Sequence, residues 1–216
     1  MPVEIFLTPS RVAKKRTESS NSKNETSTEK DGRTFSSASL SVRAQKKIVG
    51  KISNRKMVKV LTGSDVNNLF DELYRALKIH YNQNCAEKVI KYIIKISLKL
   101  FVVEQEGAIN PENTKLFNSL EKIFKNFVLT FISFNQVDFS YDRNYIAKLL
   151  DQLQNSATIL VDTYLSDKSS RRCDFIFEQI NNPLFLDNLF KGKGEIHNAL
   201  LGINKCFEVL IDTKQI

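Results

Sequence analysis

From Phe35 onward, apolar residues recur at intervals of three and four, and Pro and Gly are confined to a few positions between these periodic segments. This spacing gathers apolar side chains on one face of a helix, whereas a half-buried β-strand would alternate strictly between apolar and polar residues. The sequence contains no alternating pairs joined by an Asn-Gly turn and no internal repeat. The pattern therefore predicts an all-α fold.

Several helix starts are marked by capping residues. Asn110-Pro111 combines an Asn cap with Pro at the first helical position, Ser64-Asp65 opens an earlier helix, and Ser140 is a candidate cap for a later one. From residue 64 onward, the predicted helices span residues 64–82, 86–103, 111–131, 141–165, 172–180 and 195–213, with a further turn or two starting at Pro183.

The N-terminal segment 1–34 is rich in Ser, Thr, Asn, Lys and Glu and contains few apolar residues. Such a segment cannot bury enough surface to offset the entropy of ordering it, so we predict a disordered tail. Its basic run Lys14-Lys15-Arg16 is of a kind that is usually solvated, and we assign it no function. The chain has 15 Phe, all but one of them in the remaining residues, 35–216, which are expected to form one domain with one core.

Positive charge is concentrated between Gly32 and Ser64, where no acidic residue occurs. In a helix over this segment, Leu40, Ala44, Ile48 and Ile52 would share one side, while Arg43 and Lys46 would lie on the other and Lys47 at the border between them. A basic amphipathic helix of this kind can lie on an anionic membrane, where each cation contributes about 1 kcal/mol of attraction. An ordinary surface helix with its charges in water is the alternative.

Two further helical patterns are open to more than one interpretation. Segment 86–103 is apolar almost all round except for a narrow strip of lysines, which either faces solvent or contacts phosphate. Segments 86–103, 116–134 and 145–165 are apolar over so much of their circumference that they must surround one another. Their Phe-rich stripe is normally packed core, and an internal ligand cavity is the less common outcome.

No catalytic motif is present: there is no HExxH, GxSxG, P-loop or GxGxxG, and His80 and His197 have no Ser or Cys motif beside them. Asp138, Asp142 and Arg143 suggest helix capping and ion pairing. The three cysteines are far apart and form no CxxC pair, so neither a disulfide framework nor a metal site is indicated. We expect a non-enzyme without cofactors, cytoplasmic, with no secretion signal and no stretch long enough to span a membrane.

An ordered set of short motifs resembles the tumour necrosis factor-alpha-induced protein 8 family, also called the TIPE family. The motifs run from residue 35 to the C-terminus and are Phe35-Ser36-Ser37, Ala44-Gln45-Lys46-Lys47, Asp71-Glu72-Leu73-Tyr74-Arg75, Val89-Ile90-Lys91, Gln136-Val137-Asp138-Phe139, Asp142-Arg143, Asp167-Lys168-Ser169 and Gly202-Ile203-Asn204-Lys205.

This resemblance implies a compact bundle of six or seven helices around a deep apolar cavity that holds lipid tails. It also implies a regulator of apoptosis and inflammatory signalling that binds, and in some members transfers, phosphoinositides. The expected partners are a phosphoinositide or other anionic phospholipid, transient contact with the plasma membrane surface, and signalling proteins. The expected cavity-lining residues are Ile90, Ile94, Phe101, Phe124, Phe127, Phe131, Leu150 and Leu153.

The family's paired N-terminal lysines match Lys46 and Lys47, which are therefore the expected headgroup contacts. Two other positions that are basic in the family hold Gln105 and Glu121 here, and neither side chain can bind phosphate. The candidate substitutes are Lys122, Lys125, Lys91 and Lys95.

Two other functions are compatible with the sequence. One is a protein-interaction adaptor in cell-death signalling, similar to a death-effector bundle, without a functional lipid. The other is nucleic-acid binding through the basic segment 43–59, which ranks last because aromatic residues are not interleaved with the cations.

Overall fold

A computed structural model describes residues 35–49, 63–137 and 140–216 of the 216-residue chain. The predicted disordered tail, residues 1–34, lies outside these ranges. The described residues form helices joined by short connections, which confirms the all-α prediction. The eight helices of this part of the chain are α1 (Ser37–Val49), α2 (Ser64–His80), α3 (Gln83–Gln105), α4 (Pro111–Gln136), α5 (Arg143–Tyr164), α6 (Asp167–Ile180), α7 (Pro183–Lys191) and α8 (Glu195–Asp212).

Four of these helices begin at an Asn or Asp that caps them with its side chain. The Asn110 carboxamide oxygen accepts from the backbone N–H of Asn113 at 2.8 Å, and Pro111 occupies the first turn of α4, as predicted. The Asn182-Pro183 pair starts α7 in the same way, so this segment is a nine-residue helix rather than a turn or two. Asn82 caps α3 by accepting from the Cys85 N–H at 2.9 Å.

The predicted cap of α5 at Ser140 is wrong, whereas the capping role suggested for Asp142 is confirmed. Asp142 is the cap: its carboxylate accepts from the backbone N–H of Asn144 and Tyr145 at 2.9 and 3.2 Å. The Ser140 hydroxyl instead donates to the Val137 carbonyl at 2.6 Å. A carboxylate two residues later is the stronger cap because it accepts charge-assisted bonds at the positive end of the helix.

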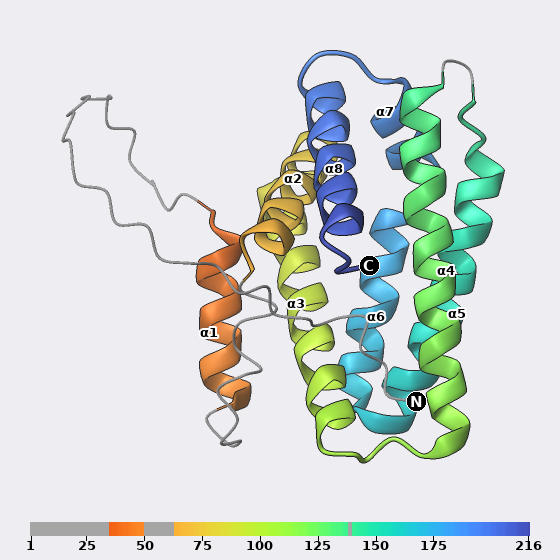
Figure 1. Ribbon diagram of the computed structural model, residues 1–216. Coiled ribbons are helices and arrows are strands. Elements are labelled where there is room, and N and C mark those ends of the chain that lie inside the picture. The colour runs from red at the N-terminus through yellow and green to blue at the C-terminus, as the bar shows by residue number, and fades with distance from the viewer. Residues whose placement is uncertain (1–34, 50–62, 138–139) are drawn as a thin grey trace, which may run out of the picture.

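The helices are arranged in two halves, with the long pair α4 and α5 running along both (Figure 1). In the view of Figure 1, α2, α7 and α8 lie in the upper half, α3 and α6 reach the lower end, and α1 lies alongside α3. Helices α2 and α8 approach closely, since a Cβ added at Gly202 would collide with the Glu72 side chain. Because α8 lies in the upper half, the lower end of the bundle is built by α3, α4, α5 and α6 without it (Figure 1).

Most buried side chains belong to one cluster shared by α1, α2, α3, α4, α5, α7 and α8. Aromatic rings join its parts: the centroid of Phe131 lies 4.9 Å from that of Phe190 on α7 and 5.3 Å from that of Phe207 on α8. A smaller cluster of Ile96, Val161, Cys173 and Ile176 joins α3, α5 and α6 in the lower half.

Helix α1 docks on the bundle through buried serines as well as apolar residues. The Ser37 hydroxyl donates to the Asn67 carbonyl at 2.9 Å, and the Ser41 hydroxyl donates to the Asn67 side chain at 3.3 Å. Ala44 is buried and Leu40 half-buried, so the predicted inward face is confirmed at these two positions. The buried serines were not predicted, because apolar periodicity gives no signal for a hydroxyl that is hydrogen-bonded in the interior.

Candidate functional site

Helix α4 presents one apolar face whose burial changes along its length. Phe131 is 4% exposed and packs against rings from α7 and α8. Among the described α4 residues before Val128, however, none is buried, although Leu116, Phe117, Leu120, Ile123, Phe124 and Phe127 are all on this face and half-buried. At about 100° per residue, Phe117 lies only about 40° around the helix from Phe131. The same face is thus packed at one end and open at the other.

The reason for this change is the position of α8. Its Phe207 ring lies 6.3 Å from that of Phe127 and 6.5 Å from that of Phe124, and the helix ends at Asp212. Figure 1 shows α8 beside the upper half of α4 only. Phe117 and Leu116 therefore lie beyond the reach of α8, and in the described part of the chain neither packs on a buried cluster. We call the half-buried set Leu116, Phe117, Leu120, Ile123, Phe124 and Phe127 the open apolar face.

The predicted cavity-lining residues fall into two groups. Ile90, Ile94, Phe131, Leu150 and Leu153 are buried members of the main core cluster. Phe101, Phe124 and Phe127 are half-buried. Phe101 follows Ile90 and Ile94 on the same side of α3, so this helix too is packed in its first half and more open near its end.

The α4 lysines named as candidate headgroup contacts do not face this open surface. Lys122 is exposed and follows Leu120 by two residues, which places it about 200° away around the helix. Lys125 forms an ion pair with Glu121 at 3.2 Å, so its charge is already compensated. This geometry gives no support to either lysine as a phosphate contact at the open apolar face.

The remaining predicted cations lie on α1 and α3. Lys91 is exposed and lies within one turn of the buried Ile94 on the same side of α3, whereas Lys95 is half-buried and lies about 140° around the helix from Ile90. Lys46 and Lys47 belong to the last two turns of α1, and their side chains are not among those described. Helix α1 starts beside α2 and runs along α3 toward the lower end of the bundle (Figure 1).

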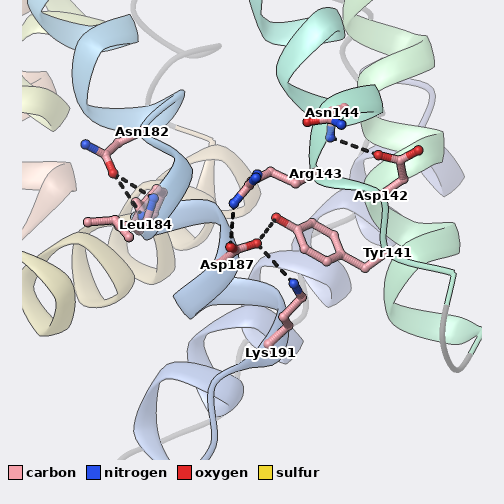
Figure 2. Close-up of polar contacts among 9 residues, drawn as sticks. Tyr141, Asp142, Arg143, Asn144, Asn182, Leu184, Asp187 and Lys191 are labelled. Carbon is pink, nitrogen blue, oxygen red and sulfur yellow. Dashed lines mark hydrogen bonds and ion pairs between the residues drawn. The ribbon is translucent and has the colours of Figure 1, made fainter.

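A polar cluster joins α5 to α7 at the opposite, upper end (Figure 2). The Asp187 carboxylate accepts hydrogen bonds from Tyr141 at 3.1 Å and Arg143 at 2.8 Å, and Lys191 lies 3.4 Å away. Partial burial raises the pKa of Asp187, but the bonds from Tyr141 and Lys191 and the charge of Arg143 outweigh it, so the pKa is lowered overall. Ion pairing was expected around Asp138, Asp142 and Arg143, and in the part of the chain that the structure describes Arg143 pairs with Asp187.

A second cluster of cations was missed by sequence reasoning. Lys168, Arg171, Arg172 and Phe175 follow one another at helical spacing on α6 and, with Tyr92 of α3, line an open depression of about 380 Å³. The spacing of three, four and seven residues was a usable signal. It was overlooked because residues 167–171 were predicted to precede this helix, which in fact begins at Asp167.

The remaining Cys, His and acidic side chains form no site of their own among the described residues. In the ranges that the structure describes, no three His, Cys, Asp or Glu side chains are grouped so that they could hold a metal ion. His80 is half-buried between the rings of Tyr81 and Phe185 and lies 3.1 Å from the Asn188 amide nitrogen, and burial lowers its pKa. Of the helices described, none combines the length and apolar character that crossing a bilayer requires.

Comparison of the sequence with known proteins assigns the chain to a family. Residues 35–214 match the family model described as tumor necrosis factor alpha-induced protein 8-like. The chain is 32% identical over 180 residues to tumor necrosis factor alpha-induced protein 8-like protein 2 B of Danio rerio, which covers 81% of this chain and 97% of the relative. Tumor necrosis factor alpha-induced protein 8 of Gallus gallus is 33% identical over 81% of this chain and 95% of the relative. The protein of the same description from Homo sapiens is 32% identical over 81% of this chain and 90% of the relative.

The chain is thus a helical-bundle protein that belongs to the tumor necrosis factor alpha-induced protein 8 family, and the resemblance found in the sequence motifs is confirmed. Membership of this family suggests a role in apoptosis and inflammation signalling.

Proposed function

We propose that the protein is a non-catalytic regulator that binds an anionic phospholipid, with the acyl chains against the open apolar face of α4 and the headgroup near the end of α1. The observation that carries the proposal is that six large apolar side chains on the first part of this face are only half-buried, and that Leu116 and Phe117 lie beyond the end of α8. Apolar surface left in this state stabilises a ligand by about 0.8 kcal/mol for each CH₂ group that it buries.

The headgroup position is inferred from charge and placement. Lys46 and Lys47 occupy the last turns of α1, which runs toward the same end of the bundle as the open apolar face (Figure 1). A phosphate group held there would receive charge-assisted hydrogen bonds. A phosphoinositide fits these requirements, and transfer of the lipid between membranes would follow from reversible binding. The proposed location is cytoplasmic, with transient contact to the plasma membrane.

Lipid extraction and native mass spectrometry of the purified full chain test the proposal. We expect a copurifying phospholipid whose binding is reduced in Leu120→Trp, because the larger side chain occupies the space beside the open apolar face. Leu201→Trp is the matched control, since Leu201 is 45% exposed on α8 and away from this face. Equal lipid content in the two variants would remove the open apolar face from the proposal.

The headgroup part is tested separately with vesicles that contain a phosphoinositide. Lys46→Gln/Lys47→Gln should weaken binding, whereas Lys115→Gln/Lys122→Gln, which removes the same charge from exposed positions of α4, should not. Equal weakening would mean that net charge alone drives association. Capture of a signalling protein that survives Leu120→Trp, with no lipid bound to the unmodified chain, would instead favour a protein-interaction adaptor.

A further inference from the structure

The groove between α3 and α6 carries a group of cations that the proposed lipid site does not use. Lys168, Arg171 and Arg172 lie on one side of α6 at helical spacing, and Phe175 continues the same side. With Tyr92 of α3 they line the open depression of about 380 Å³ described above.

One of the cations is held in place by an aromatic ring. The guanidinium carbon of Arg172 lies 5.1 Å from the centroid of the Tyr92 ring, and the Phe175 ring meets Tyr92 edge to face at 5.7 Å. A cation–π contact fixes a planar guanidinium without neutralising its charge. Arg172 is therefore oriented at the edge of the depression with its hydrogen-bond donors available.

A fourth cation adds to the positive field from the neighbouring helix. The Lys99 ammonium donates to the hydroxyl of the buried Ser169 at 2.8 Å and is half-buried. Burial lowers the pKa of Lys99, and the charges of Arg172 and Lys168 lower it further. Like charges are thus close enough to repel one another, and a bound anion would relieve this repulsion.

Carboxylates on α6 do not compensate this charge. Asp167 and Asp174 lie four and three residues from Arg171, within reach of a helical ion pair. Among the contacts of the described residues, neither forms an ion pair with Arg171, and Lys168 and Arg172 form none with any carboxylate. Within the described residues, the depression therefore combines cations that form no direct ion pair with an oriented guanidinium, which is a combination that can bind phosphate.

We propose that the depression lined by Tyr92, Lys168, Arg171, Arg172 and Phe175 is a binding site for a phosphate monoester, separate from the proposed lipid site on α4. Arg171 and Lys168 contact the phosphate oxygens, Arg172 is oriented toward them by Tyr92, and Lys99 contributes charge from α3. A phosphate monoester has a charge of about −1.5 to −2 at neutral pH, which matches several cations better than a carboxylate does. The group can come from a soluble phosphate ester or from a membrane lipid headgroup.

The soluble source is tested by titrating the full chain with glycerol 3-phosphate, with glycerol as the uncharged control. Lys168→Gln/Arg171→Gln should weaken binding about tenfold or more, as expected for the loss of charge-assisted bonds. Lys148→Gln/Lys205→Gln is the matched control, because it removes the same charge from exposed positions of α5 and α8. Backbone amide shifts on titration of the unmodified chain give a second measurement that requires no variant, and they should be largest within residues 168–175.

The lipid source is tested with phosphatidylcholine vesicles with and without phosphatidic acid, in the Lys46→Gln/Lys47→Gln background so that the proposed headgroup contacts on α1 are absent. A further loss of binding on adding Lys168→Gln/Arg171→Gln, but not Lys148→Gln/Lys205→Gln, supports the site with a membrane headgroup as the source. If Lys168→Gln/Arg171→Gln weakens binding of glycerol 3-phosphate but not of the vesicles, the site is supported with a soluble phosphate ester as its source. Equal behaviour of the site and control variants in both assays, or amide shifts confined to other residues, would overturn the proposal.

Discussion

Truncating two phenylalanines of α4 measures directly whether its apolar face is open. Phe131 and Phe117 lie on the same face of one helix, so Phe131→Ala and Phe117→Ala remove identical atoms in nearly the same orientation. They differ in packing: Phe131 is 4% exposed with rings of Phe127, Phe190 and Phe207 within 6.0 Å, whereas Phe117 is half-buried beyond the end of α8.

The expected costs follow from this difference. Phe131→Ala leaves a cavity inside the core and should lower the free energy of unfolding by about 3–5 kcal/mol. Phe117→Ala loses only part of a transfer free energy and leaves no enclosed void, so its cost should be about 1 kcal/mol. For a domain of this size the two variants should melt roughly 10 °C and roughly 3 °C below the unmodified protein.

Urea unfolding of delipidated protein, followed by circular dichroism, gives both values from one assay. Adding back the phospholipid should raise the cost of Phe117→Ala, since a ligand that binds only the folded state stabilises the unmodified protein more than a variant with weakened binding. The cost of Phe131→Ala should change little. Equal costs for the two truncations without lipid would mean that Phe117 is as well packed as Phe131, and the open apolar face would be refuted.

Three further predictions concern polar groups. Asp187→Asn should lower the free energy of unfolding by about 1 kcal/mol at neutral pH. Because the pKa of Asp187 is lowered in the folded state, the carboxylate contributes its full stabilisation above the unfolded-state pKa of about 3.9 and loses it as the pH falls through the lower folded-state pKa. The melting curves of the two proteins should therefore converge in acid. Burial raises the pKa of Glu104, so Glu104→Gln should stabilise the protein at neutral pH and have no effect once the carboxyl is protonated in both states; a loss of stability at pH 7 would contradict this. Ser37→Ala removes the hydroxyl bond to α2 and should cost about 1 kcal/mol, with faster amide hydrogen exchange in α1, while unchanged exchange would show that α1 docks without it.

Local sequence signals determined the helices and several of their ends. Asn110-Pro111 predicted the start of α4 because a side-chain acceptor and a ring-constrained residue act within one turn, whatever the rest of the chain does. The sequence offered both Ser140 and Asp142 as caps of α5, since both side chains have acceptors, and only the structure shows that Asp142 is the cap. Apolar periodicity likewise identified the inner face of α4, and the motif order identified the family.

The sequence could not show where this inner face is covered. Phe117 and Phe131 are the same residue in the same periodic pattern, and their different exposure depends on where α8 begins and ends relative to α4. The groove between α3 and α6 has the same origin, because Tyr92 and Arg172 are eighty residues apart and meet only when the two helices pack. Periodicity thus determines which face of each helix turns inward, whereas the positions of the helix ends relative to one another, set by the packing of the whole bundle, decide which part of that face remains open to a ligand.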